Sequence, residues 1–98
     1  MTKQLCVYID DERTPKRMGW TVCRSFDEAI DCLNTHWDEI GEISLDHDLG
    51  FGKTGYDVAK WIEEQIELCG RKPTFFMHCH SANSAGRKNI MAVFDKYN

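Results

Sequence analysis

Residues 44–50 read Ser-Leu-Asp-His-Asp-Leu-Gly, and they set two carboxylates and an imidazole directly after an apolar run. The run from Ile43 to Leu45 is typical of a buried strand, which we expect over residues 42–46. Aspartate is a poor strand residue, and open α/β sheets hold their ligands at the carboxyl ends of their strands. Asp and Gly are also ordinary turn residues, so this stretch alone favours a functional site only modestly.

Composition limits the size of the protein and the class of its partners. The chain has 98 residues, 42% of them apolar, which suits a single domain over residues 1–98 with one modest core. Its formal charge is −4, and it has no basic arm or long run of lysine and arginine. We therefore expect no binding to extended duplex nucleic acid, whereas a small phosphorylated ligand in a local basic pocket is compatible with this charge.

Localisation signals and cysteines point to the cytoplasm. No apolar run has the length of a transmembrane helix, and the N-terminus lacks the apolar core of a signal peptide, so we expect no membrane association. The five cysteines are odd in number, and no two have Cys-x-x-Cys spacing. We therefore expect reduced thiols in a cytoplasmic protein, and the sequence does not fix the oligomeric state.

Hydrophobic patterns predict four strands and three helices. We expect strands over residues 5–9, 20–24, 42–46 and 74–80, and helices that begin at residues 25 and 54 and after the turn over residues 81–86. Ser25 with Glu28, and Thr54 with Asp57, have the spacing of capping boxes. Because parallel strands connect right-handedly, we expect a three-layer α/β fold with a short four-stranded parallel sheet in the order 2-1-3-4.

Acidic side chains follow two of these strands and histidines follow a third, and the carboxyl ends of parallel strands meet at one edge of a sheet. Clustered carboxylates favour a hard divalent cation, most plausibly Mg²⁺, with Mn²⁺ as an alternative. The candidate metal ligands are Asp10, Asp11, Asp46 and Asp48. Zn²⁺ is the competing prediction, because histidines 47, 78 and 80 with an aspartate also form a plausible transition-metal site.

Two histidines are candidates for acid–base catalysis, because imidazole titrates near neutral pH. His47 lies between two aspartates, and His80 stands at the end of the fourth strand. Strand alternation places His78 on the same face as His80 but one step deeper, where we expect a hydrogen-bonded residue with a structural role. Asp46, His47 and His80 are therefore our predicted catalytic residues.

The start of the last helix is a candidate anion site. Exposed N–H groups at a helix N-terminus bind anions, and Ser81 and Asn83 add polar side chains there. Arg87 and Lys88 lie in the first turns, where cations oppose the helix dipole, so a bound phosphate would explain them. Arg13 is a further candidate phosphate ligand. Solvated surface cations are an almost equally good explanation of Arg87 and Lys88.

Several of these motifs together resemble a known family. Residues 8–15 (Tyr-Ile-Asp-Asp-Glu-Arg-Thr-Pro), 45–50 (Leu-Asp-His-Asp-Leu-Gly), 54–57 (Thr-Gly-Tyr-Asp) and 80–83 (His-Ser-Ala-Asn) are similar to the cyclic-phosphate processing receiver-like family, which is related to response-regulator receiver domains. The resemblance implies a receiver-like, flavodoxin-like fold. It also implies that Asp10 and Asp11 hold a divalent cation and that Asp46 stands where receivers take up phosphate.

The departures from a receiver favour hydrolysis over a phosphorylation switch. We expect no fifth strand and no lysine at its end, so Arg87 or Lys88 would have to replace that lysine, and ordinary receivers have no place for the added histidines. We predict a metal-dependent phosphoesterase that acts on cyclic phosphates, at RNA 2′,3′-cyclic ends or in cyclic nucleotides. The alternatives are a non-catalytic receiver-like module that binds phosphate, a phosphorylated ligand or a partner protein, and a small metal-stabilised interaction domain.

Overall fold

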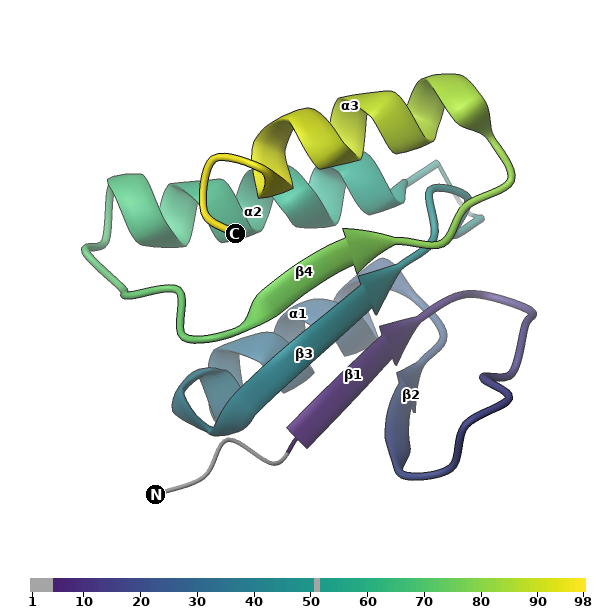
Figure 1. Ribbon diagram of the computed structural model, residues 1–98, viewed down its shortest axis with the longest axis horizontal. Helices are drawn as coiled ribbons and strands as arrows, with labels where there is room; N and C mark the ends of the chain where they lie inside the picture. Colours follow the sequence, from purple (N-terminus) through teal and green to yellow (C-terminus); the bar gives the residue numbers. More distant parts are fainter. Residues whose placement is uncertain (1–4, 51) are drawn as a thin grey trace.

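Four parallel strands form the centre of the computed structural model, which describes residues 5–50 and 52–98 (Figure 1). Residues 1–4, and Phe51 in the turn after the third strand, lie outside the described residues. The elements are β1 (Leu5–Ile9), β2 (Trp20–Cys23), α1 (Phe26–His36), a single 3₁₀ turn η1 (Trp37–Glu39), β3 (Ile40–Leu45), α2 (Gly55–Glu67), β4 (Phe76–Cys79) and α3 (Ser84–Phe94).

The sheet has the predicted order, β2-β1-β3-β4, and every pairing is parallel. Ile9 pairs with both Cys23 and Leu45, and Leu45 pairs with Cys79, so all four strands end in one register row. β3 ends at Leu45, one residue earlier than predicted, and Asp46 is the first residue beyond it. β1, β3 and β4 therefore end immediately before the candidate site residues Asp10, Asp46 and His80.

All three helices pack on one face of the sheet. In Figure 1, α1 lies behind the strands, and α2 and α3 lie above β4 with α2 behind α3. The steps from β2 to β3 and from β3 to β4 run in the same direction, and right-handed crossovers then place α1 and α2 on the same side. The side chains that point toward the helices form one fully buried core. From the strands this core includes Val7, Ile9, Ile43, Leu45 and Met77.

The opposite face of the sheet carries no helix formed by the described residues. The step from β1 to β2 runs in the reverse direction, so its connection belongs on this second side, and residues 10–19 form a loop there. The third layer that the sequence predicts is therefore this loop, and it leaves much of the face open. Phe76, on this face of β4, has 55% of its surface exposed.

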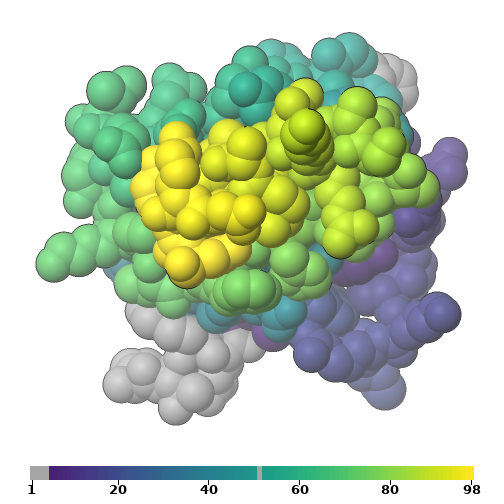
Figure 2. Space-filling model, turned by 45° about the horizontal axis from the view of Figure 1, so that its top comes forward, coloured from purple at the N-terminus to yellow at the C-terminus, as the bar shows by residue number. Residues whose placement is uncertain are grey.

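The free edge of β4 is closed by a single side chain where a receiver has a fifth strand. The Asn98 Nδ2 donates to the carbonyl of Met77 at 2.7 Å, and the Asn98 Oδ1 accepts from the Met77 N–H at 2.9 Å. This amide pairs with both outward backbone groups of Met77 as a neighbouring strand would. Figure 2 shows these last residues, in yellow, packed over the helical side of the molecule beside α2.

Local polar contacts fix where α2 begins. The predicted capping box is present, because the Thr54 side chain accepts from the Asp57 N–H and the Asp57 Oδ2 accepts from the Thr54 N–H at 2.8 Å. Gly55 follows, and a Cβ built on it would lie 2.0 Å from the carbonyl oxygen of Asp46. Only glycine therefore lets α2 start against the backbone of Asp46.

None of the helices within the described residues is long and apolar enough to cross a membrane.

We predict that Asp57→Ala lowers the free energy of unfolding by about 1 kcal/mol at pH 7, the usual contribution of a helix cap. The backbone N–H of Thr54 lowers the pKa of the Asp57 carboxyl, more than partial burial raises it. Its contribution is then complete above the unfolded pKa of about 3.9 and is lost as the pH falls through the lower folded pKa. Urea unfolding should therefore show a smaller difference near about pH 3. An undiminished difference there, or an equal loss in the α2 surface control Glu64→Ala, would contradict this assignment.

Candidate active site

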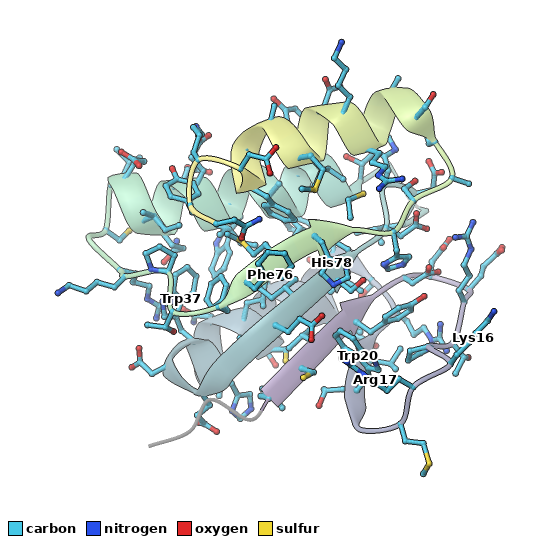
Figure 3. All side chains as sticks on the ribbon, in the orientation of Figure 1. Lys16, Arg17, Trp20, Trp37, Phe76 and His78 are labelled. Atoms are coloured by element: carbon cyan, nitrogen blue, oxygen red, sulfur yellow. The ribbon has the colours of Figure 1, made fainter. Side chains whose placement is uncertain are left out.

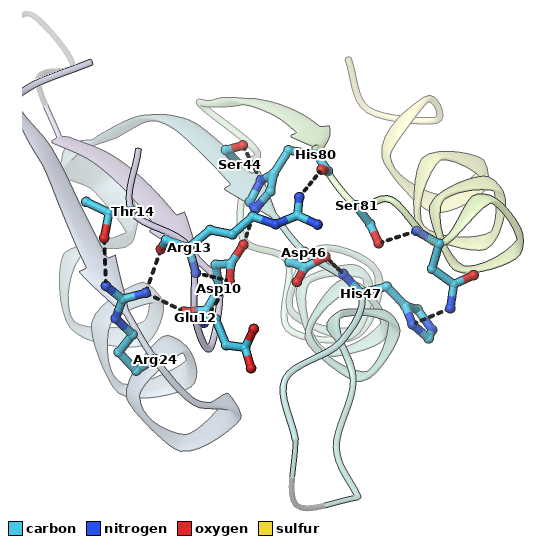
Figure 4. A network of polar contacts seen from close by, with 11 residues as sticks. Asp10, Glu12, Arg13, Thr14, Arg24, Ser44, Asp46, His47, His80 and Ser81 are labelled. Atoms are coloured by element: carbon cyan, nitrogen blue, oxygen red, sulfur yellow. Dashed lines mark hydrogen bonds and ion pairs between the residues drawn. The ribbon is translucent and has the colours of Figure 1, made fainter. Parts of the chain in front are cut away.

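Three side chains occupy the row immediately beyond the strand ends. Asp10, Asp46 and His80 each extend the parallel ladder by one bond, because their N–H groups donate to the carbonyls of Cys23 (3.1 Å), Ile9 (2.9 Å) and Leu45 (3.1 Å). Strand alternation points all three side chains to the helix-free face. One ligand atom from each lies within 4.8 Å of the others (Figure 4). Asp10, Asp46 and His80 are called the carboxyl-edge row below.

Asp10 is held on both of its oxygens. The side chain has 1% of its surface exposed, and its Oδ1 accepts from the N–H groups of Glu12 (2.9 Å) and Arg13 (2.8 Å). Its Oδ2 lies 2.9 Å from the His80 Nε2. Burial on its own would raise the pKa of this carboxyl, but the Arg13 and Glu12 amides and His80 outweigh burial and hold the pKa below its ordinary value. Asp10 is therefore a carboxylate at neutral pH.

His80 is held at both ring nitrogens and on one face. Its Nδ1 lies 2.7 Å from the Ser44 Oγ, and its ring stacks on Tyr8 with centroids 4.3 Å apart and planes at 9°. Because ionised Asp10 only accepts, the Nε2 carries a proton, and in the neutral ring the Nδ1 then accepts the Ser44 hydroxyl. The chain Ser44–His80–Asp10 thus fixes both the tautomer and the orientation of this imidazole.

Asp46 lies between the strand ends on one side and the start of α3 on the other. It has 6% of its surface exposed, and its Oδ1 accepts from the His47 N–H at 2.9 Å. His47 continues toward α3 and not toward the carboxyl-edge row (Figure 4). Its ring packs on Gly86, where a Cβ would lie 2.3 Å from the His47 Cγ.

The hydrogen bonds of His47 depend on its protonation. Its Nδ1 lies 3.2 Å from the Asp48 Oδ1 and 3.4 Å from the Asn83 Nδ2. The Asn83 Oδ1 accepts from the Gly86 N–H, which fixes the amide so that its NH₂ group faces His47. A protonated Nδ1 can donate to Asp48, whereas a bare Nδ1 can accept from Asn83. The imidazole therefore has a partner in either state.

The start of α3 is already capped by its own side chains. Asn83 is the N-cap residue, and the Ser81 Oγ accepts from the Asn83 N–H at 3.0 Å. Two of the polar groups that we expected to bind an anion therefore cap the local backbone. Arg87 and Lys88 both lie exposed on the first turns of this helix.

Of the other predicted residues, Arg13 lies at the site, whereas Asp11 and Asp48 lie at its rim. The Arg13 Nη1 donates to the carbonyl of His80 at 3.4 Å, which places this guanidinium over the carboxyl-edge row (Figure 4). Asp11 and Asp48 are not members of the group of ligand atoms within 4.8 Å. The Asp11 Oδ2 would lie 3.7 Å from a Cβ on Gly50, so Asp11 faces the loop after β3.

His78 lies on the open face of the sheet, not deep beneath the site as we predicted. Its side chain is 35% exposed, its Nε2 lies 3.0 Å from the Glu42 Oε2, and its ring stacks on Phe76. The predicted face and the predicted hydrogen bond of His78 are confirmed. Only the expected burial was wrong, because no helix of the described residues covers this face.

Two residues of the site were missed in the sequence. Ser44 orients His80, and its position two residues before Asp46 puts it on the same strand face, so a polar residue inside that apolar run was the available signal. Arg24 secures the loop after β1, because its Nη1 donates to the carbonyls of Arg13 (2.6 Å) and Asp10 (3.3 Å). No spacing rule connects Arg24 to that loop.

A family comparison agrees with this arrangement. The family model described as the cyclic-phosphate processing receiver domain matches residues 5–96. The chain belongs to this family. No curated protein and no solved structure matches it. The resemblance that the motifs indicated is therefore confirmed, and so is the receiver-like parallel sheet.

This member of the cyclic-phosphate processing receiver family presents a definite set of groups at its carboxyl edge. Asp10 and Asp46 offer buried carboxylate oxygens, and His80 offers an imidazole nitrogen. Oxygen and nitrogen donors of this kind are those that divalent cations bind. Arg13 adds a cation of the kind that pairs with phosphate oxygens.

Proposed function

We propose that this domain is a metal-dependent phosphoesterase that hydrolyses cyclic phosphates at RNA ends or in cyclic nucleotides. The carboxyl-edge row is the observation that carries the proposal, because it combines two buried carboxylates with an oriented imidazole at the open edge of the sheet. The description of the family, cyclic-phosphate processing, supports the choice of substrate.

The donors of the row suit a divalent cation. Two buried carboxylates this close repel each other unless a cation lies between them. Oxygen donors suit Mg²⁺ and Mn²⁺. Zn²⁺ would require the His80 Nε2 to give up its proton and bind the ion, which would leave proton transfer to His47. Asp11 and Asp48 remain predicted ligands of the outer rim. A bound cation would supply charge neutralisation for the phosphate and would lower the pKa of a coordinated water.

Opening a cyclic phosphate requires two proton transfers. A water oxygen bonds to phosphorus and loses a proton, and the ester oxygen that leaves phosphorus gains one. His80 is the first candidate for proton transfer, because its Nε2 proton lies in the carboxyl-edge row, 2.9 Å from the Asp10 Oδ2. His47 is the second candidate, because it has a hydrogen-bond partner whether its Nδ1 is protonated or bare.

Cations near the row are proposed to hold the phosphate. Arg13 lies over the row and can form paired hydrogen bonds with two phosphate oxygens. Ser81, Asn83, Arg87 and Lys88 form a second candidate group at the start of α3. The capping bonds of Ser81 and Asn83 reduce what this group can offer, so Arg13 ranks first.

One observation favours a non-catalytic alternative. Both ring nitrogens of His80 are engaged, and His80 must release a partner before it can exchange a proton with a substrate. A module that binds a phosphorylated ligand or partner protein needs no such release. Such a module would bind cyclic phosphates without turnover.

We predict that Mn²⁺ or Mg²⁺ raises the melting temperature and that Asp46→Asn removes most of this gain. At one hundred times its dissociation constant, a ligand stabilises the folded state by about 2.7 kcal/mol. Asp46→Asn is a better test than Asp10→Asn, because Asp10 also holds the loop after β1 through two backbone amides. Thermal unfolding across a metal titration measures the effect, with the exposed Asp31→Asn on α1 as control. A flat titration in the unmutated protein would exclude the metal site.

We predict that His80→Ala cuts turnover by roughly 10²-fold or more, the usual scale for the loss of a general acid or base. His36→Ala is the matched control, because His36 pairs at the surface of α1 with Glu39 and lies outside the site. The assay follows hydrolysis of 2′,3′-cyclic and 3′,5′-cyclic nucleotides and of RNA with a 2′,3′-cyclic end, with each metal in turn.

Two results would contradict the proposal. Full activity in folded His80→Ala would remove His80 from the chemistry. If no phosphoester is turned over by the unmutated protein while cyclic phosphates still bind, the binding module replaces the enzyme.

A further inference from the structure

The helix-free face of the sheet holds a groove that is continuous with the carboxyl-edge row. Its volume is about 670 Å³. Below the row, the register brings Tyr8, Ser44 and His78 side by side, and the next row holds Glu42 and Phe76. The groove is lined by Tyr8, residues 13–17, Trp20, Glu42, Ser44, His78 and His80, so it begins at the site itself.

The charge of this groove is opposite to that of the protein. Its lining contains three cations, Arg13, Lys16 and Arg17, and one acid, Glu42, whereas the chain as a whole carries −4. The three cations all come from the loop after β1, which runs along one wall. The local excess of cations therefore favours an anionic ligand in this groove, although the whole protein is acidic.

Flat rings line the same groove. Tyr8 and Trp20 meet edge to face with centroids 5.7 Å apart, and the Arg17 guanidinium lies 4.7 Å from the centre of the Trp20 ring. Figure 3 shows Arg17, Trp20, Phe76 and His78 on this one side of the sheet. Rings beside cations on an open sheet match the chemistry of single-stranded nucleic acid, where bases stack and phosphates pair with arginine or lysine.

Arg17 is free to exchange its partner. It pairs with the Glu42 Oε1 at 2.9 Å, but its side chain is 62% exposed, and an ion pair this exposed contributes little to stability. Burial would raise the pKa of Glu42, yet Arg17 and His78 outweigh it and hold the pKa below its ordinary value. If Arg17 turns to a phosphate, His78 remains at 3.0 Å from Glu42.

We propose that this groove binds the single-stranded RNA segment that precedes the terminal cyclic phosphate. Bases stack against the rings of the open face, and Lys16 and Arg17 pair with the backbone phosphates, while the cyclic end lies at the carboxyl-edge row. This inference rests on the proposed function for the placement of the cyclic end. It assigns Trp20, Arg17 and Lys16 as ligand-binding residues outside the catalytic centre.

The test measures binding without turnover. The probe is a fluorescein-labelled single-stranded hexa-adenylate with a plain 3′-phosphate, followed by fluorescence anisotropy. Trp20→Leu should weaken binding about tenfold, within the range for loss of a stacked base. Arg17→Gln should weaken binding and reduce the slope of log Kd against log salt by about 0.7 to 1. Arg71→Gln is the matched control, because Arg71 stacks on Trp37 at 5.0 Å outside the groove, and it should bind as the unmutated protein does.

The outcomes separate this inference from the proposed function. Hexamer binding that depends on Trp20 and Arg17 supports the groove even if no cyclic phosphate is hydrolysed. Hydrolysis with hexamer affinity unchanged in both variants overturns the groove and leaves the enzyme intact. Equal binding of a hexaglutamate peptide, or hexamer binding no tighter than that of inorganic phosphate, also overturns it. If Trp20→Leu does not fold, the exposed Arg17→Gln decides alone.

Discussion

The register of the parallel ladder is the constraint on which the site depends. Asp10, Asp46 and His80 come from segments far apart in the chain, and three backbone hydrogen bonds bring them into one row. A shift of one residue in any strand would turn that strand's side chains to the opposite face, and the row would lose a member. The buried core fixes the register, because Ile9, Leu45 and Met77 must all face the helices. The packing of the core therefore also fixes the geometry of the site.

The direction of the strand steps has an equally broad consequence. Both helical crossovers run the same way, so they cover one face, and the reversed first connection is a loop on the other. That loop supplies the backbone amides that hold Asp10 and the cations along the groove. The open face is therefore not a defect of packing. Under the proposed function, it is the surface from which the ligand reaches the carboxyl-edge row.

Strand patterns in the sequence were sufficient to predict the sheet order and to place Asp10, Asp46 and His80 at a common edge. They could not predict which of two consecutive acids joins the row, because that depends on the end of β1 and on which face lacks helices. The same missing information led us to expect a buried His78, whose position on the strand was predicted correctly. Arg24 holds the loop after β1, and Tyr8 stacks on His80. Both contacts depend on three-dimensional packing, so they leave no periodic signal in the sequence. Ser44 was readable in principle from its alternation with Asp46.

Anomalous diffraction from a crystal soaked with Mn²⁺ is the sharpest test of the metal site, because it locates the cation without depending on activity. We predict one strong peak coordinated by Asp10 and Asp46 beside His80, with the His80 ring still held by Ser44. A peak at Asp11 and Asp48 with the row vacant, or an unoccupied row at saturating Mn²⁺, would contradict it.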